Sequence, residues 1–370
     1  MRIALLGTRG IPANYGGFET FAEELSARLV KRGHHVAVYC RTNNVSSRVT
    51  PYRGVELKFL PTIPHKYLDT LAHTAISTVH ALFGRYDAVL YCNSANAILT
   101  FAPRVIGTPT ALNVDGLERD RRKWNKLGQA WYSLSERLSC WLPSETITDA
   151  AVIHKYYAER YGKSSHLIAY GADFEKESST GTLERLGLEP GQYFLYVSRM
   201  EPENNALLVA KAFAQTSVPQ RLALVGDAPY AADYMRAVKS VTDPRIVMPG
   251  GIYGKGYREL QSHCLAYVHA TEVGGTHPAL IEAMGRGAPT LYLDTPENVE
   301  VAGDAGMPFG PSEKALAKLI ENTAAMAPAE LAEWRWRAET RARSRYDWEQ
   351  VTDQYEHLLS AMIQRSLPLG

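Results

Sequence analysis

Short apolar segments alternate with longer amphipathic segments along this chain, and this alternation limits the folds that it can adopt. The short segments are rich in Val, Ile, Leu and Tyr, and the longer ones repeat apolar residues at helical spacing. Strands that alternate with helices pair in parallel, because each helix carries the chain back across the sheet. In the first half we expect strands at residues 3–7, 35–40, 55–60, 87–92, 110–114, 146–149 and 166–169.

A polar stretch at residues 173–181 interrupts this pattern and is the candidate linker. The alternation then resumes, and a charged helical region follows from Pro328. A length of 370 residues exceeds that of a usual single core. We therefore predict an α/β protein with two Rossmann-like parallel-sheet domains, residues 1–175 and 176–345. Ligands bind beyond the carboxyl ends of such strands, so we expect the site in a cleft between the domains.

Composition excludes several classes of function. The 40 basic and 39 acidic residues nearly balance, so bulk charge does not indicate nucleic-acid binding. The four cysteines lack C-x-x-C spacing and indicate buried free thiols rather than a zinc site. The chain enters a strand without the apolar core of a signal peptide, and it contains no run of about eighteen apolar residues. We expect a cytoplasmic protein, with peripheral membrane contact left open.

The glycine-rich segment Val273–Pro289 lies between two expected strands and should contain a helix. Pro278 suits the first turn of that helix, and Thr276 can cap it. The two preceding glycines let the backbone approach a ligand, and the N–H groups of the first turn favour an anion. Glu282, one turn further on, could accept hydrogen bonds from ligand hydroxyls. From this segment alone, a strand-to-helix turn without a ligand is an equally good interpretation.

Motifs along nearly the whole chain resemble, in order and spacing, those of family 4 glycosyltransferases. That family has the GT-B fold, in which two Rossmann-like domains face each other across a cleft. The resemblance also implies that a C-terminal helix, residues 346–370, crosses back to the first domain. The motifs are Gly16-Gly17-Phe18-Glu19, Arg32-Gly33-His34-His35-Val36, Val197 to Asn205, Leu224 to Pro229, Gly250-Gly251-Ile252, the segment Val273–Pro289, and Tyr346-Asp347-Trp348-Glu349.

The resemblance implies roles for individual residues in binding a nucleotide-sugar donor. Arg199 falls where the family places a cation on the donor diphosphate, and its fork of donors suits a phosphate and the charge of a leaving group. The helix that starts near Thr276 would bind the same diphosphate, and Glu282 would hold the ribose hydroxyls. The other implied donor-binding residues are Gly16, Gly17, Gly250, Gly251, Ile252, Gly274, Gly275 and His277.

Three segments are most similar to the bacterial rhamnosyltransferases of capsule and cell-wall polysaccharide synthesis: Asn113–Glu118, Gly274–Thr276 and Glu201–Asn205. This narrower resemblance implies a retaining enzyme that moves rhamnose from dTDP-rhamnose onto a saccharide acceptor, which could be lipid-linked. Related members use other nucleotide sugars, such as UDP-GlcNAc or UDP-glucose. The sequence lacks an Asp-x-Asp pair, the usual holder of a divalent ion on a nucleotide sugar, so we expect no metal and no cofactor.

The chain departs from the family pattern in two places. Asn204 stands where a Lys is common, and Gly274 stands where a Glu commonly faces the sugar; Glu272 is near but out of register. Lys255 or Arg258 could replace the missing cation. These departures keep a catalytically silent nucleotide-sugar-binding protein among the alternatives, and a nucleotide-sugar epimerase on the same scaffold is the other.

Two features of the first half have open interpretations. Asp115 follows an expected strand and could contact the acceptor as a catalytic residue, or it could cap the next helix. The cationic segment Glu118–Lys126, with Trp131, Tyr132 and Trp141 beyond it, could form a helix on an anionic membrane surface. A solvated helix with core tryptophans explains the same residues equally well.

Overall fold

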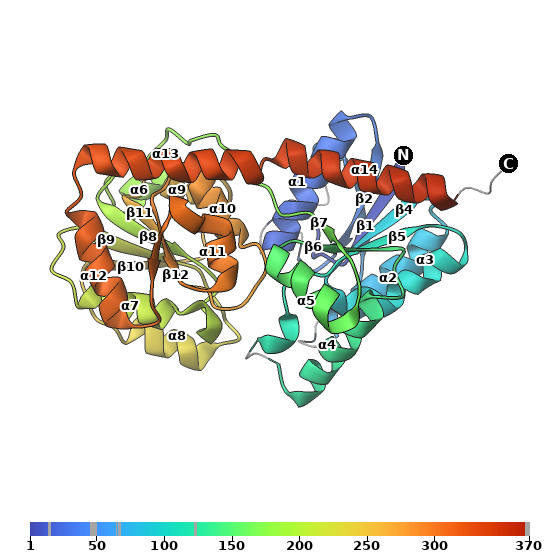
Figure 1. Ribbon diagram of the computed structural model, residues 1–370, viewed down its shortest axis with the longest axis horizontal. Coiled ribbons are helices and arrows are strands. Elements are labelled where there is room, and N and C mark those ends of the chain that lie inside the picture. Colours follow the sequence, from blue (N-terminus) through green and yellow to red (C-terminus); the bar gives the residue numbers. More distant parts are fainter. Residues whose placement is uncertain (14–15, 45–49, 64, 66–67, 122–123, 367–370) are drawn as a thin grey trace. The chain divides into compact units, whose positions relative to one another are not determined.

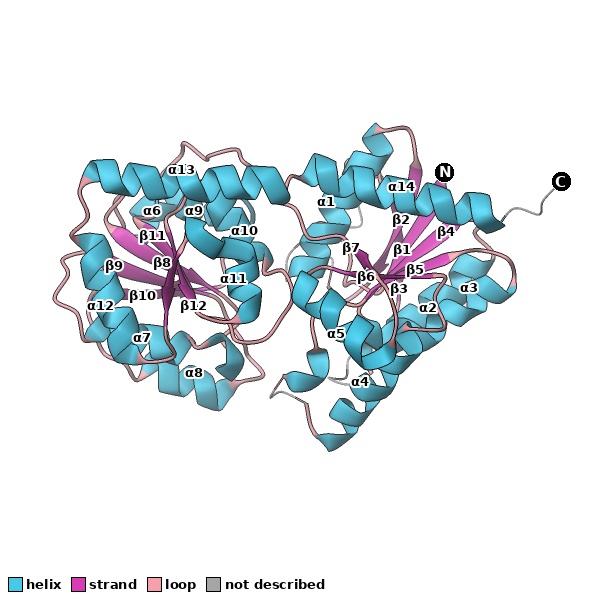
Figure 2. Cartoon of the chain, viewed as in Figure 1, coloured by secondary structure: helices cyan, strands magenta, loops and turns pink. Residues whose placement is uncertain are grey.

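A computed structural model describes residues 1–13, 16–44, 50–63, 65, 68–121 and 124–366 and divides the chain into two compact units (Figure 1). Unit 1 contains Met1–Tyr170 together with Trp348–Gly370, and unit 2 contains Gly171–Asp347. The first division therefore falls a few residues before the expected boundary at 175. Each unit has its own parallel sheet, and helices cover the sheet faces (Figure 2).

The sheet of unit 1 has the strand order β3-β2-β1-β4-β5-β6-β7, and its strand pairs are parallel. Its strands are β1 Arg2–Leu6, β2 His35–Arg41, β3 Glu56–Leu60, β4 Ala88–Cys92, β5 Thr110–Asn113, β6 Glu145–Thr148 and β7 His166–Leu167. Every residue of β4 is buried, as expected for a central parallel strand that is covered on both faces.

Helices and short 3₁₀ turns connect these strands. They are α1 Gly17–Lys31, α2 Asp69–Leu82, η1 Ser94–Thr100, α3 Phe101–Val105, η2 Glu118–Asp120, α4 Lys126–Ser139 and α5 Ala151–Tyr161. The C-terminal helix α14, Trp348–Ser366, lies beside α1 (Figure 1). Phe21 of α1 packs its ring 5.2 Å from that of Tyr355, and the buried amide of Asn113 donates to the Tyr355 hydroxyl at 2.9 Å. The chain end is thus built into the core of unit 1.

The sheet of unit 2 has the order β10-β9-β8-β11-β12-β13, again with parallel pairs. Its strands are β8 Tyr193–Val197, β9 Arg221–Val225, β10 Ile246–Gly250, β11 Ala266–His269, β12 Thr290–Leu293 and β13 Met307–Phe309. Its helices are α6 Gly181–Leu186, η3 Pro202–Asn204, α7 Ala206–Ala214, α8 Ala232–Lys239, α9 Gly254–His263, α10 Pro278–Gly285, α11 Pro296–Ala302, η4 Gly303–Ala305, α12 Glu313–Ala324 and α13 Pro328–Arg345.

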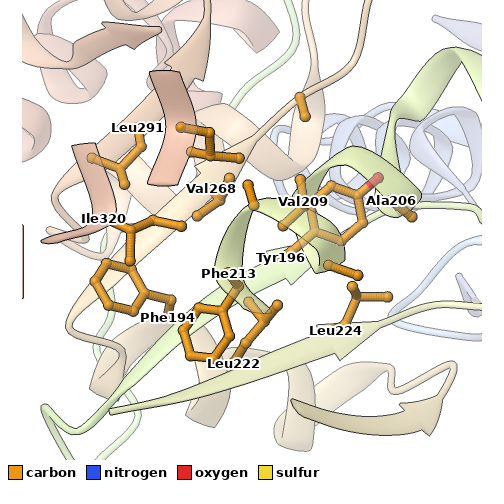
Figure 3. Packing of buried hydrophobic residues seen from close by; sticks show 14 of the residues in the cluster. Phe194, Tyr196, Ala206, Val209, Phe213, Leu222, Leu224, Val268, Leu291 and Ile320 are labelled. Atoms are coloured by element: carbon orange, nitrogen blue, oxygen red, sulfur yellow. The ribbon is translucent and has the colours of Figure 1, made fainter. Parts of the chain in front are cut away.

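The core of unit 2 lies between its sheet and the covering helices (Figure 3). Phe194 of β8 meets Phe213 of α7 edge to face, with ring centroids 6.3 Å apart, and Leu222, Val268 and Leu291 come from neighbouring strands. Burying one such side chain stabilises the fold by roughly 1.5–3 kcal/mol. This packing holds β8 and β11, the strands that lead to the predicted donor residues.

The expected linker at residues 173–181 is wrong, because this stretch is packed onto unit 2. The hydroxyl of Ser179 donates to Glu259 Oε1 at 2.7 Å, and the other carboxylate oxygen of Glu259 accepts from the Thr182 amide at 2.6 Å. The helical region after Pro328 consists of two helices, α13 and α14, separated at Tyr346 and Asp347, close to the expected start of the C-terminal helix at 346. The chain passes between the units at Tyr170–Gly171 and Asp347–Trp348.

Candidate functional site

The predicted donor residues of unit 2 follow neighbouring strands at one edge of its sheet. β8 lies between β9 and β11, and Tyr196 pairs in parallel register with Val268. Arg199 and Thr271 therefore follow adjacent strands by the same number of residues. Because the carboxyl ends of parallel strands share an edge, the fold brings Arg199 and the loop before α10 to the same side of unit 2.

Hydrogen bonds to the backbone carbonyl of Arg199 hold the turn that carries this residue. That carbonyl accepts from Asn204 Nδ2 at 2.7 Å and from the Glu201 amide at 2.7 Å. Asn204 is itself buried, and its carbonyl accepts from the Tyr196 hydroxyl at 2.6 Å. The Asn at this place therefore fixes the conformation of the turn, a role that a Lys side chain could not perform in the same way.

The guanidinium of Arg199 is partly exposed, with 31% of the side chain accessible, while the Glu201 side chain beside it is buried. Arg199 Nη2 lies 3.6 Å from Glu201 Oε2, and Glu201 Oε1 accepts from the Tyr230 hydroxyl at 2.8 Å. One carboxylate thus orients a cation at the edge of the sheet. The exposed N–H groups of the Arg199 guanidinium are of the kind that donates to a phosphate.

Asn205 joins the loop after β8 to the loop after β11. Its Nδ2 donates to the Ala270 carbonyl and to Glu272 Oε1, each at 2.9 Å, and the Glu272 amide donates to the Glu203 carbonyl at 2.9 Å. Glu272, the carboxylate near the family's sugar-facing position, is thus engaged in holding the two loops together. Asn205 has φ 61°, a left-handed conformation that Asn tolerates better than most residues.

Helix α10 begins at Pro278, as predicted, but its N-cap is His277 rather than Thr276. The reason is that Pro278 occupies the first helical position, which leaves the residue immediately before it as the cap. His277 makes no side-chain capping hydrogen bond. Pro278 has no N–H, and the Leu280 amide donates to the His277 carbonyl at 3.0 Å, so it is the positive end of the helix dipole that favours an anion here.

The ring of His277 lies directly against Gly274. A Cβ at Gly274 would stand 2.4 Å from His277 Cε1, closer than real Cβ contacts allow. The same ring has its centroid 4.7 Å from the ring of His269, the last residue of β11. Burial, and then the neighbouring His277, lower the pKa of His269 well below its ordinary value, so His269 is neutral. Position 274 has no room for a side chain while His277 keeps this place.

Glu282 lies on α10 and is held by a chain of hydrogen bonds from α9. Its Oε2 accepts from the Tyr257 hydroxyl at 2.6 Å, that hydroxyl accepts from Gln261 Nε2 at 2.7 Å, and Gln261 Oε1 accepts from Arg286 at 2.8 Å. Burial, followed by the Glu282 charge, raises the pKa of Tyr257 well above its usual value, so the phenol stays protonated and donates. Sequence reasoning missed this network, although Tyr257 and Gln261 show the spacing of one helix face.

The remaining unit 2 residues lie at the end of β10 and on α9. Gly250 ends β10 with φ 83°, and its carbonyl accepts from the Gly226 amide at 2.9 Å, next to exposed Gly251 and half-buried Ile252. Lys255 Nζ is 4.0 Å from Glu177 Oε1. The pKa of Glu177 is lowered by its hydrogen bond from Ser179 and further by Lys255 and Arg258. Lys255 and Arg258, the two candidates for the missing cation, therefore both stabilise the charged form of Glu177.

The predicted residues of unit 1 also follow strands of one parallel sheet. Gly16 is the N-cap of α1, Gly17 is its first residue, and Glu19 Oε1 of the same turn accepts from the Arg9 amide at 2.9 Å. Asp115 follows β5 with φ 60°. It caps no helix, because η2 is capped by Leu117 and α4 by Asn125. The capping interpretation of Asp115 is therefore wrong.

In the described part of the cationic segment Glu118–Lys126, the helical residues are those of the short turn η2 and Lys126, which begins α4, so these residues do not form the surface helix that one interpretation required. Glu118 is buried and pairs with Arg121 at 2.5 Å, and Arg119 donates to the buried Glu136 at 3.1 Å. Arg122 and Lys123 lie outside the described residues. The ion pairs form because folding buries Glu118 and Glu136 there, and a buried carboxylate requires a partner.

Among the described residues, no group of three or more His, Cys, Asp or Glu side chains is placed to hold a metal ion. No helix in the same part of the chain is long and apolar enough to cross a membrane.

Two family models match the chain. Residues 1–173 match one described as a domain of unknown function, DUF1972, and residues 191–325 match one described as glycosyl transferases group 1. No protein with curated annotation matches this chain.

Several solved structures share the fold. Sucrose-phosphate synthase from Thermosynechococcus elongatus superposes with a TM-score of 0.82 at 19% identity, over 98% of this chain and 99% of that one. Anabaena HepE in complex with UDP-glucose gives 0.79 at 18% identity, over 98% and 100%. WaaG, a glycosyltransferase involved in lipopolysaccharide biosynthesis, gives 0.71 at 16% identity, over 96% and 99%. The two parallel-sheet units are those of the GT-B fold.

Proposed function

We propose that this chain, in which residues 191–325 are a glycosyl transferases group 1 domain, is a retaining glycosyltransferase that moves a hexose from a nucleoside-diphosphate sugar to a saccharide acceptor. The observation that carries the proposal is the placement of Arg199 and the start of α10 after adjacent strands, with Asn205 joining their loops. A cation and the amino end of a helix at one edge suit a diphosphate.

The proposed chemistry needs little from the protein beyond charge stabilisation and positioning. The bond between the anomeric carbon and the diphosphate oxygen breaks, and the acceptor oxygen bonds to the same face of that carbon. The departing phosphate oxygen takes the acceptor's proton. Arg199 and the α10 amides would stabilise the charge that develops on the leaving group. Asp115 of unit 1 would bind the acceptor hydroxyl.

The other residues would bind the nucleotide. Glu282, held by Tyr257, presents a carboxylate to the ribose hydroxyls, and the turn Gly250–Ile252 would line the base. His277 and the backbone of Gly274–Thr276 would contact the phosphates. On the side of unit 1, Gly16 and Gly17 would bring the backbone close to the sugar.

We propose dTDP-rhamnose as the donor, on the resemblance of Asn113–Glu118, Gly274–Thr276 and Glu201–Asn205 to bacterial rhamnosyltransferases. The acceptor would then be a growing surface polysaccharide, carried on a lipid. A UDP-hexose is the second candidate donor, and the likeness to HepE, whose structure holds UDP-glucose, supports it.

A thermal-shift screen tests the donor first. The protein is melted with deoxythymidine, uridine and guanosine diphosphates and with their sugars, because a ligand that binds the folded state raises the melting temperature with occupancy. We expect dTDP and dTDP-rhamnose to give the largest shift. A larger shift with UDP and UDP-glucose would select the second donor, and no shift with any nucleotide would refute the proposed function.

Turnover then separates transfer from its rivals. A transferase releases nucleoside diphosphate only when a saccharide acceptor is present, and the anomeric configuration of its product matches that of the donor. Conversion of the donor without acceptor would indicate an epimerase. Donor binding without turnover across a panel of saccharides would indicate a silent binding protein.

A further inference from the structure

The C-terminal helix α14 brings one hydroxyl into the interior of unit 1. Tyr355 lies in the middle of α14 and is fully buried. The helix itself is fixed on α1, because Arg32 at the end of α1 pairs with three carboxylates of α14 (Figure 1). The Tyr355 ring also packs 5.2 Å from the ring of Phe21 of α1. Tyr355 is therefore a fixed point for the groups that its hydroxyl contacts.

The Tyr355 hydroxyl contacts the buried side chain of Asn113, the last residue of β5. Asn113 Nδ2 donates to this hydroxyl at 2.9 Å, and Asn113 Oδ1 accepts from the Asp115 amide at 3.1 Å. The backbone of Asn113 belongs to the sheet, and its carbonyl accepts from the Asn93 amide at 2.9 Å. One buried side-chain amide therefore connects the C-terminal helix to the backbone of Asp115.

The orientation of the Asn113 amide depends on Tyr355. An asparagine side chain has a donor end and an acceptor end, and rotation by half a turn exchanges them. Because the Tyr355 hydroxyl accepts from the donor end, the acceptor end faces the N–H of Asp115. Without this hydroxyl, the buried Nδ2 would lose that bond, and a rotated amide would set one N–H group against another.

Asp115 needs such support because its backbone conformation is uncommon. Its φ of 60° lies in the left-handed region, which is disfavoured for residues other than glycine, although Asp tolerates it better than most. Asn93, which follows the adjacent strand β4, has φ 76°. Conformations of this kind gather at functional sites and persist only where surrounding contacts hold them. The contact of Asn113 with Asp115 is one that holds this turn.

We propose that Tyr355 is a positioning residue for the acceptor: through Asn113, it holds the backbone from which the Asp115 carboxylate extends. The inference deepens the proposed function and rests on it, since Asp115 is the residue proposed there to bind the acceptor hydroxyl. Tyr355 is buried and would not itself contact the acceptor. A misplacement of about 1 Å at a group that orients a substrate can slow a reaction strongly, so a distant hydroxyl can act on transfer.

Two buried tyrosines of unit 1 provide a matched test. Tyr355→Phe removes the hydroxyl that binds Asn113, and Tyr39→Phe removes a hydroxyl of β2 that hydrogen-bonds to His80 Nδ1 at 2.9 Å. Both variants should lower the melting temperature by a few degrees, because each loses a buried hydrogen bond. Only Tyr355→Phe should raise the KM of the saccharide acceptor, by roughly threefold to tenfold. The nucleotide concentration that gives half of the thermal shift should stay unchanged in both.

Asn113→Ala tests the same connection from its other end. It should raise the acceptor KM at least as much as Tyr355→Phe does. The double variant Asn113→Ala/Tyr355→Phe should be no worse than Asn113→Ala, because the two residues act in series and their effects are not additive. If Asn113→Ala does not fold, the comparison of the two tyrosine variants decides alone.

Amide hydrogen exchange measured by NMR gives a readout that needs no turnover. The N–H of Asp115 should exchange about tenfold faster in Tyr355→Phe and in Asn113→Ala than in the wild type, because it loses its oriented acceptor. In Tyr39→Phe this N–H should exchange at the wild-type rate.

Two results would overturn the positioning role: an unchanged exchange rate at Asp115 in Tyr355→Phe, or the same acceptor KM in Tyr355→Phe and Tyr39→Phe. The exchange measurement is independent of the proposed function. Faster exchange in a protein that transfers no sugar to any acceptor would sustain the support of Asp115 and refute the proposed transferase. Sugar transfer with neither exchange nor KM changed in Tyr355→Phe would do the reverse.

Discussion

The side-chain amide of Asn204 donates to the backbone carbonyl of Arg199 at 2.7 Å, and this bond shapes the turn that presents the guanidinium. The residue stands where the resembled family commonly has a Lys. Its amide is directed at the backbone of the turn, and the residue is buried. At this place the chain has no second cation beside Arg199. Asn204 instead holds the turn that carries Arg199.

Asn204→Ala should make the turn that carries Arg199 less rigid. The Arg199 carbonyl would lose one of its donors, and we expect a loss of about 1–2 kcal/mol in stability together with a lower kcat, because the guanidinium would no longer be held in place. Thermal melts and transfer assays measure both. As a control, Asn322→Ala changes an exposed Asn on α12 of the same unit. A variant that kept the wild-type kcat would contradict the role of Asn204 in positioning Arg199.

Arg199→Ala should chiefly reduce transition-state stabilisation. We expect kcat to fall by about a hundredfold while donor affinity changes less, because the charge on the leaving phosphate develops only during transfer. Steady-state kinetics and nucleotide titration distinguish the two effects. Arg236→Ala, at an exposed arginine of α8, serves as the control. Unchanged kcat would remove Arg199 from the proposed chemistry.

Tyr257→Phe should weaken donor binding more than turnover. The variant removes the hydroxyl that donates to Glu282 at 2.6 Å, which leaves the carboxylate that we propose to hold the ribose less well oriented. We expect the donor KM to rise roughly tenfold, in line with the loss of about one hydrogen bond to a charged group. Tyr193→Phe is the matched control, because that hydroxyl donates to the Leu260 carbonyl and not to Glu282. Equal effects of both variants would argue for general destabilisation.

Gly274→Ala should displace His277. The added methyl would meet the imidazole at 2.4 Å, so the ring must leave its place against His269. We expect a stability loss of about 1–3 kcal/mol, as for other overpacked positions, and a lower kcat/KM for the donor. Gly310→Ala, where an added Cβ meets no atom within 4 Å, is the control. If both variants keep the stability and the kcat/KM of the wild type, the packing of His277 on Gly274 contributes to neither.

Arg32→Ala should destabilise unit 1 in a pH-dependent way. Arg32 bonds to Glu349, Asp353 and Glu356 of α14, and its hydrogen bonds are the main cause of the lowered pKa of Glu349 and Glu356. A carboxyl whose folded pKa is lowered stabilises the fold above its unfolded value, near 4.5, and this contribution is lost as pH falls through the folded pKa.

Two of the three partners of Arg32, Glu349 and Asp353, are largely exposed, so solvent screens the ion pairs. We expect the variant to lose about 1 kcal/mol of stability, or a few degrees of melting temperature, at neutral pH. The difference between variant and wild type should shrink as the pH is lowered below 4.5. Melting curves across this range provide the measurement. A difference of the same size in acid would mean that lost packing, rather than charge, accounts for the effect.

Much of the fold follows from local pattern. The apolar runs of β4 and β8 are buried on both faces, and this requirement alone predicts central parallel strands. Pro278 likewise marks the start of α10, because proline is accepted only in the first turn. By contrast, the short strand β13 and helix α11 were not expected, since neither carries enough apolar repeat to stand out.

The donor residues of unit 2 are a prediction from motifs, and their hydrogen-bond partners were not predicted at all. Nothing local in the sequence indicates that Glu272 would meet Asn205, that Glu282 would meet Tyr257, or that the cations near Glu118 would turn inward. The first two pairs join residues 67 and 25 positions apart in the chain, and only the packing of neighbouring elements brings them within bonding distance.

The order of strands and helices, their parallel pairing and the position of the glycine-rich turn were therefore determined by the sequence itself, through side-chain periodicity and the limits on proline. The tertiary structure decided which polar groups form hydrogen bonds within the candidate site and which face the solvent. It placed Asn204 under Arg199, filled the space above Gly274 with His277, and left Leu127 and Trp141 exposed. Burial is a property of the assembled unit, because a side chain loses its water only when other elements cover it.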